Sequence, residues 1–155
     1  MRRSKRAGFT AIELLVVLGL IGLVAALAVP LFQRYSGLLK AQAAAGALAQ
    51  DLQLARALAA RRGRPVVVTF GGAGYNLAFL QPDGNRRTVK VVDWSREFPN
   101  VVLEPPSGVT EIRFDNRGFV VPSRGAPSTL VFTVRHRAGV EQVVVNPLGR
   151  VSRGS

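Results

Sequence analysis

The sequence contains no cysteine and only one histidine among its 155 residues. Without cysteine the chain can form no disulfide and hold no thiolate site. The single histidine, His136, falls in a predicted turn with no cysteine or acidic cluster beside it, which argues against a metal site. We therefore expect His136 to be a solvated turn residue and expect no bound metal.

Signatures of catalysis are also missing. The glycine-rich tract 71–74 leads into a predicted strand, whereas a phosphate-binding loop leads into a helix and carries Lys and Ser or Thr. No nucleophile-elbow motif is present to act with His136. We expect no enzymatic activity, no catalytic residue and no cofactor.

Acidic residues are scarce: 9 of them face 21 basic residues, which gives a net charge of +12. Beyond the basic leader, the surplus lies in two segments, with +5 over residues 34–64 and +4 over residues 111–155, while residues 65–108 are neutral. A basic surplus indicates an anionic partner, either nucleic acid or a lipid surface. The abundance of Arg, Ala, Gly and Val would also follow from a GC-rich genome, so both explanations stay open.

The amino terminus consists of a basic leader, residues 1–8, and a 21-residue apolar run, residues 9–29. A helix of this length is about 31 Å long and matches the hydrocarbon core of a bilayer. Its one carboxylate, Glu13, is costly in lipid and is therefore a functional candidate. The four basic leader residues predict a single-pass inner-membrane protein whose residues 31–155 lie on the periplasmic or outer side.

The leader and the apolar run leave three interpretations open. They fit a secretory signal cleaved at Ala26-Leu27-Ala28, which would release a secreted binding domain. They also fit an uncleaved signal anchor. The third interpretation is a type IV prepilin signal, which is cleaved on the cytoplasmic side and keeps the apolar helix.

Residues 8–17 read GFTAIELLVV and resemble the prepilin motif GFTLIELLVV, with Ala11 as the one departure. Counted from Phe9, Glu13 is the fifth residue and Pro30 the twenty-second, and both positions are characteristic of the type IV pilin family. The resemblance therefore favours the third interpretation.

The resemblance implies cleavage by prepilin peptidase between Gly8 and Phe9 and N-methylation of Phe9. The helix would then pass from membrane lipid, through an inner-membrane assembly platform, into a filament of pilin subunits. There the methylated amine of one subunit would neutralise Glu13 of its neighbour, because opposite charges attract strongly in a medium of low dielectric constant.

Beyond the apolar run, a helical pattern continues to about residue 62, where Gly63 and Pro65 end it. Small apolar residues recur at steps of three and four: Leu38, Ala41, Ala45, Leu48, Leu52, Ala55 and Ala59. Strands are predicted at 66–70, 75–80, 88–92, 101–104, 111–114, 129–135 and 140–146, with an exposed loop at 99–108 between two small sheets.

Four segments of this half resemble the pseudopilin H and minor pilin T family (GspH/FimT-like). They are 51–59 (DLQLARALA), 64–68 (RPVVV), 112–118 (IRFDNRG) and 146–151 (NPLGRV). The resemblance implies an α+β pilin fold, in which a long amino-terminal helix packs against an antiparallel β domain of two small sheets. The implied parts are a leader (1–8), a transmembrane assembly helix (9–30), an amphipathic extension (31–63) and the β domain (64–155).

The basic carboxy-terminal residues are the candidate DNA-binding site, because arginine matches phosphate oxygens with a bidentate fork. We expect Arg135, Arg137, Arg150 and Arg153 to gather where the last hairpin meets the tail. Some minor pilins of this family bind DNA through a terminal Gly-Arg-x-Arg motif. Here residues 149–153 read GRVSR, so the second arginine comes one position late. In a strand it would face the opposite side, whereas in a flexible tail the shift would matter little.

The sequence therefore predicts a minor type IV pilin or pseudopilin whose partners are other pilin subunits and, through its arginines, double-stranded DNA during uptake. The alternative function is that of the minor pseudopilin H of a type II secretion system, acting in protein export.

Overall fold

A computed structural model describes residues 10–71, 73–122 and 128–154. The chain divides into two compact units, Met1–Ser36 and Gly37–Ser155. The long helix α1 (Ala11–Arg62) runs through both units and contains Pro30. Within the first unit every described residue before Ser36 is exposed, and the apolar part of α1 is long and apolar enough to cross a membrane.

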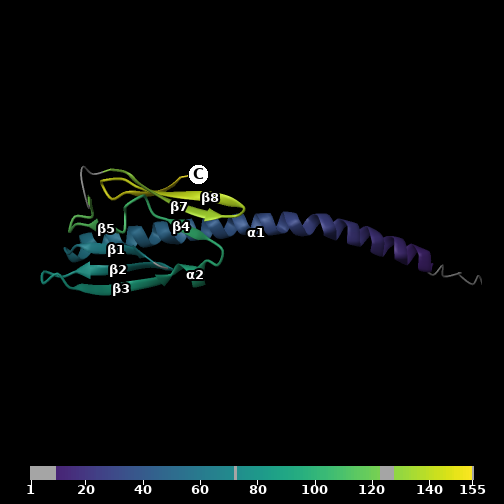
Figure 1. The fold of residues 1–155 in the computed structure, drawn as a ribbon, viewed down its shortest axis with the longest axis horizontal. Helices are drawn as coiled ribbons and strands as arrows, with labels where there is room; N and C mark the ends of the chain where they lie inside the picture. The colour runs from purple at the N-terminus through teal and green to yellow at the C-terminus, as the bar shows by residue number, and fades with distance from the viewer. Residues whose placement is uncertain (1–9, 72, 123–127, 155) are drawn as a thin grey trace, which may run out of the picture. The chain divides into compact units, whose positions relative to one another are not determined.

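The second unit contains two antiparallel sheets (Figure 1). The five-stranded sheet has the order β3-β2-β1-β5-β6 and the four-stranded sheet the order β4-β7-β8-β9. Their strands are β1 (Val66–Gly71), β2 (Gly74–Leu80), β3 (Arg86–Asp93), β4 (Val102–Glu104), β5 (Glu111–Phe114), β6 (Val120–Val121), β7 (Leu130–His136), β8 (Gly139–Val145) and β9 (Val151–Gly154). A short helix, α2 (Trp94–Glu97), follows β3.

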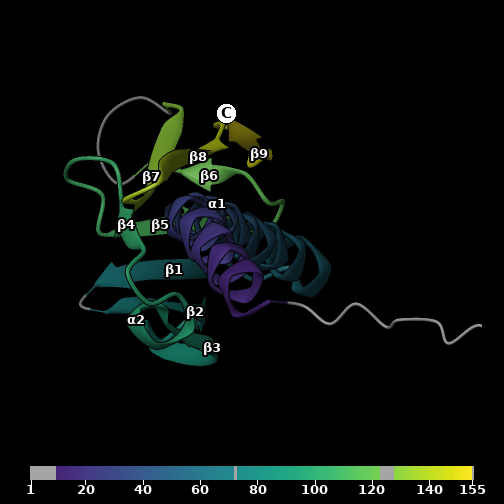
Figure 2. The ribbon, with the colours of Figure 1, turned by 90° about the vertical axis from the view of Figure 1, so that its right-hand side faces the viewer.

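The helical segment 37–62 of α1 runs between the two sheets, with β1, β2 and β3 on one side of it and β7 and β8 on the other (Figure 1, Figure 2). Most of the residues that the periodicity selected, from Ala41 to Ala59, are fully buried. Their small side chains let bulky strand residues such as Phe114 and Phe132 approach closely in a single core. Since every described residue that is buried lies between Gly37 and Val151, the unit Gly37–Ser155 is expected to fold without the first unit.

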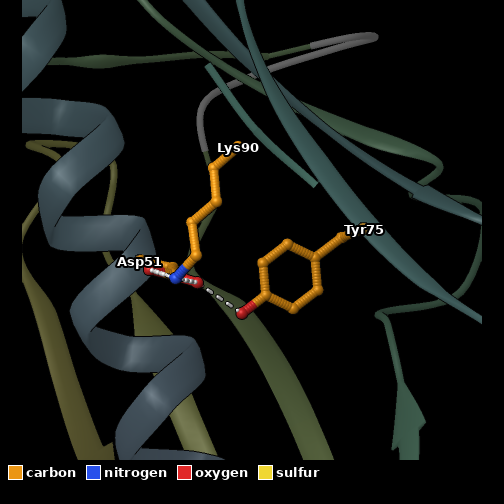
Figure 3. A network of polar contacts seen from close by, with 3 residues as sticks. All are labelled: Asp51, Tyr75 and Lys90. Carbon is orange, nitrogen blue, oxygen red and sulfur yellow. Dashed lines mark hydrogen bonds and ion pairs between the residues drawn. The ribbon is translucent and has the colours of Figure 1, made fainter. Parts of the chain in front are cut away.

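One carboxylate is buried within this core. Asp51 of α1 is only 6% exposed. It accepts a 2.8 Å hydrogen bond from the Tyr75 hydroxyl and bonds of 2.7 and 2.8 Å from the Lys90 ammonium group (Figure 3). An unpaired buried charge would cost several kcal/mol, so these contacts fix β2 and β3 to one turn of the helix. Burial, with the hydrogen bond to Asp51, raises the pKa of Tyr75 above its ordinary value of 10.0.

Three of the segments that carry the family resemblance meet on one side chain. The stem of Arg56 on α1 lies beneath Gly118, in the turn after β5, and beneath Gly149, in the turn after β8. Both glycines have positive φ angles, 84° and 75°. A Cβ atom on Gly149 would overlap the carbonyl oxygen of Gly118, so the two turns can stack on the helix only without side chains.

The sequence predicted the α+β class, the two sheets and seven of the strands to within about two residues at each end. It missed α2, β6 and β9, which are only four, two and four residues long.

The prediction that His136 is a solvated turn residue was wrong. Its ring packs so closely against Gly37 of α1 that a Cβ atom there would overlap it, and its Nδ1 accepts a 3.1 Å hydrogen bond from the Ala138 amide.

Replacing Gly149 with alanine should destabilise the protein strongly. Gly84→Ala is a matched control, because Gly84 also has a positive φ, 81°, but open space around it. We expect Gly84→Ala to cost about 1–2 kcal/mol of unfolding free energy from the backbone alone. Gly149→Ala should cost about 1–3 kcal/mol more, from overpacking. Urea unfolding measures both, and equal losses would contradict the stacked turns.

Stability should fall at alkaline pH because the pKa of Tyr75 is raised in the folded state. Above about pH 10 the unfolded tyrosine loses its proton while the folded one keeps it, so the unfolding free energy decreases by up to about 1.4 kcal/mol per pH unit. Below about pH 10 the tyrosine is protonated in both states, and its contribution to the unfolding free energy is fully present. Urea titrations of residues 37–155 and of the same unit carrying Tyr75→Phe isolate this effect, since the variant has no phenol to lose a proton.

The same unit offers a direct optical check, because Tyr75 is its only tyrosine. The phenolate absorbance should stay absent in the folded protein and appear together with unfolding. A phenolate that forms near pH 10 without unfolding would contradict the buried hydrogen bond to Asp51.

Candidate functional site

Glu13 lies in the first turn of α1 and closes a reciprocal cap with Thr10. The Thr10 amide and hydroxyl both donate to Glu13 Oε2 at 2.8 Å, and the Glu13 amide donates to Thr10 Oγ1 at 3.3 Å. This arrangement is a capping box, which satisfies two of the backbone donors that a helix start leaves free. Such satisfaction matters most in lipid, where water cannot provide it.

Pro30 lies inside α1, and the helix continues through it. Proline has no N–H, so the carbonyl of Ala26 receives no helical hydrogen bond and α1 is weakened there. The predicted cleavage and methylation site, Gly8 and Phe9, lies outside the described residues, as does the whole leader.

The first two of the four candidate DNA-binding arginines lie near the tip of the β7–β8 hairpin. Arg135 pairs in register with Val140 of β8, and its guanidinium forms a 3.0 Å ion pair with Glu104. Arg137 is exposed in the hairpin turn. Arg135 is thus already neutralised within the chain, whereas Arg137 takes part in none of the ion pairs among the described residues.

Of the other two arginines, Arg150 directly precedes β9 and Arg153 lies within it. Arg150 is exposed, and its amide donates to Asn146 Oδ1 at 2.8 Å in the turn before the strand. Arg153 pairs with Val143 in register, and its guanidinium group lies beside Gly46 of α1. Ser152 therefore occupies the outward-facing position where the Gly-Arg-x-Arg motif places its second arginine, and Arg153 faces the helix.

The structure does not gather the four arginines into one patch. The register places Arg135 opposite Val140 and Val151 opposite Val145. Val140 and Val145 are five residues apart on β8. Arg135 and Val151, the residue after Arg150, are therefore about 17 Å apart along the strand direction.

Other basic side chains, which the sequence did not single out, do converge. Arg62 and Arg64 at the end of α1 and Arg87 on β3 line one open groove of about 560 Å³. The only signal for them in the sequence was the surplus of +5 over residues 34–64. Arg87 lies in the neutral segment, and only the pairing of β3 with β2 brings it to the groove.

Metal chemistry finds no support in the described part of the chain. Among residues 10–71, 73–122 and 128–154, no three His, Asp or Glu side chains lie close enough to hold a metal ion.

Comparisons with known proteins agree with the architecture. Residues 44–149 match the sequence model of the family described as type II transport protein GspH. The chain is 34% identical over 161 residues to the pilin-like protein PilA1 of Thermus thermophilus, covering 94% of this chain and 96% of that one.

Two crystal forms of the type IV minor pilin FimU of Pseudomonas aeruginosa PAO1 share the fold. They superpose with TM-scores of 0.61 and 0.60 at 21% and 20% identity. The match covers 74% of this chain and 87% and 92% of those.

Proposed function

Because the chain belongs to the GspH family and is a structural subunit of the minor pilin or pseudopilin type, we propose that it serves a type IV pilus that takes up DNA. In this proposal prepilin peptidase cleaves after Gly8, and the new amino group of Phe9 is methylated. The subunit works by assembly and not by catalysis.

The observation that carries the assembly step is the exposed apolar helix with its single carboxylate. Every described residue from Thr10 to Tyr35 is exposed, so this segment needs lipid or other helices around it. Among the described residues the Glu13 carboxylate accepts hydrogen bonds only from Thr10 and takes part in no ion pair. A neighbour's methylated Phe9 amine supplies that cation in the filament, which favours one axial register.

The DNA contact is supported by arginines that are exposed and free of ion pairs. Arg137 and Arg150 meet both conditions among the described residues. Exposed arginines bind the phosphate backbone without sequence preference and with strong salt dependence.

A second candidate is favoured by one observation, the match to a family described as a type II transport protein. In that case the subunit belongs to a secretion pseudopilus and its arginines contact other subunits. Both candidates share the membrane stage, in which α1 crosses the inner membrane once and the globular unit lies on its periplasmic or outer side.

Glu13→Ala should block assembly without blocking processing. We expect the variant to be cleaved like the wild type, with mass spectrometry of the membrane form giving methylated Phe9 as the first residue. It should be lost from sheared filaments, because the buried amine of its neighbour has no counter-charge. Glu97→Ala, at an exposed carboxylate of the globular unit, serves as the control. Filaments that contain Glu13→Ala at the wild-type level would sink the pairing, and a first residue at Val29 would sink the prepilin assignment itself.

DNA contact is tested with residues 37–155 and a fluorescent DNA duplex across a salt series. We expect weak binding that falls steeply with salt. Replacing Arg137 and Arg150 by glutamine should lower the slope of log K against log salt by about 2, since each phosphate contact contributes about 0.9. Absence of binding even at low salt would refute the DNA contact and favour the secretion candidate.

A further inference from the structure

We propose that the groove between the end of α1 and the β2–β3 hairpin, lined by Arg62, Arg64 and Arg87, is the principal DNA-phosphate site of this subunit. The inference rests on the proposed DNA contact and moves its centre away from the tail. The groove has a volume of about 560 Å³, and no carboxylate is among the residues that line it.

The backbone holds two of the arginines in place. Gly63, with a φ of 60°, ends α1, and the Arg64 amide donates to the carbonyl of Ala59 at 3.2 Å. This bond closes a Schellman motif, which fixes the backbone on both sides of the glycine. Pro65 then leads directly into β1, where its carbonyl accepts from the Leu80 amide at 2.9 Å. Arg62 and Arg64 are thus held at the groove by an ordered turn.

The third arginine reaches the groove through the sheet register. Arg87 pairs with Phe79 of β2, and both residues line the groove. Its neighbour Arg86 bonds to Thr69 Oγ1 and forms a 2.9 Å ion pair with Glu111. Adjacent strand residues point to opposite faces of a sheet. Arg86 is therefore neutralised on the outer face, and Arg87 lies on the other face with Arg62 and Arg64.

Nothing in the described part of the chain neutralises the three groove arginines. Four ion pairs occur among the described residues, and none includes Arg62, Arg64 or Arg87. The nearby carboxylate of Asp83 accepts two hydrogen bonds from Asn85 instead. The negative end of the helix dipole accounts for a basic residue at 62, but Arg64 and Arg87 lie outside the helix. Three unneutralised arginines around one groove fit a run of phosphates.

The position of the groove shows which of the two exposed arginines, Arg137 or Arg150, can contact the same DNA. The turn that leads into Arg150 stacks on Arg56, about 9 Å along α1 from Arg62. Arg137 follows His136, which packs on Gly37, about 38 Å along the helix from Arg62. Arg150 therefore lies at the groove end of the unit and Arg137 at the opposite end, so Arg150 can extend the same phosphate track.

The test compares two variants of residues 37–155 that lose the same charge. The groove variant carries Arg62→Gln, Arg64→Gln and Arg87→Gln. The control carries Lys40→Gln, Arg96→Gln and Arg113→Gln, at exposed residues outside the groove. Duplex-DNA binding is measured across a salt series, and thermal unfolding establishes that both variants fold.

We expect the groove variant to bind DNA about tenfold or more weakly, with a salt slope reduced by about 3, and the control to keep most of its affinity. Equal losses in both variants, with the wild type binding, would overturn the groove site and leave the DNA contact standing. A wild type that does not bind would instead overturn the proposed function.

Anionic phosphatidylglycerol vesicles form a second arm, because lipid headgroups present the same phosphate chemistry. A groove variant that loses vesicle binding but retains DNA binding would overturn the inference in favour of a lipid surface.

Discussion

Close packing between the small-residue face of α1 and the strands around it governs the globular unit. Alanines such as Ala45 and Ala55 are fully buried, and because they end at Cβ, the helix backbone comes near the sheets. The bulk of the core is supplied from the other side by residues such as Phe114 and Phe132. The same closeness leaves room for His136 only against Gly37, and for the two stacked turns only as glycines. One helix face therefore determines how closely the strands and turns around it can approach.

Periodicity made most of this fold predictable. A stripe at steps of three and four, and apolar runs bounded by turn residues, are local signals that survive without tertiary information. The missed elements are not local. Two-residue β6 depends on contacts with distant segments, such as the bond from the Val120 amide to the Pro147 carbonyl, and β9 exists because β8 offers it a partner. Asp51 was not foreseen, since a carboxylate in a helix normally faces water.

The candidate sites differ in the same way. Glu13 and Pro30 could be found because the prepilin motif fixes their spacing along one segment, and the structure places both in one helix. The arginine groove could not be found, because Arg62 and Arg87 are 25 residues apart and meet only through the β2–β3 register. A terminal motif drew attention to Arg153, yet strand geometry turns that side chain toward the helix. The sequence gives the number of charged residues, but only the fold determines which of them lie together on one surface.

The two acidic residues of α1 occupy apolar settings and are satisfied by opposite means. Asp51 has both a hydrogen-bond donor and a cation from its own chain, so its charge is compensated once the unit folds. Glu13 has hydrogen bonds from Thr10 but takes part in none of the ion pairs among the described residues. Hydrogen bonds satisfy its oxygen atoms without cancelling its charge, and an uncancelled charge in a medium of low dielectric constant remains costly. The helix therefore carries one carboxylate that completes the fold and another that, in the proposed filament, a second subunit neutralises.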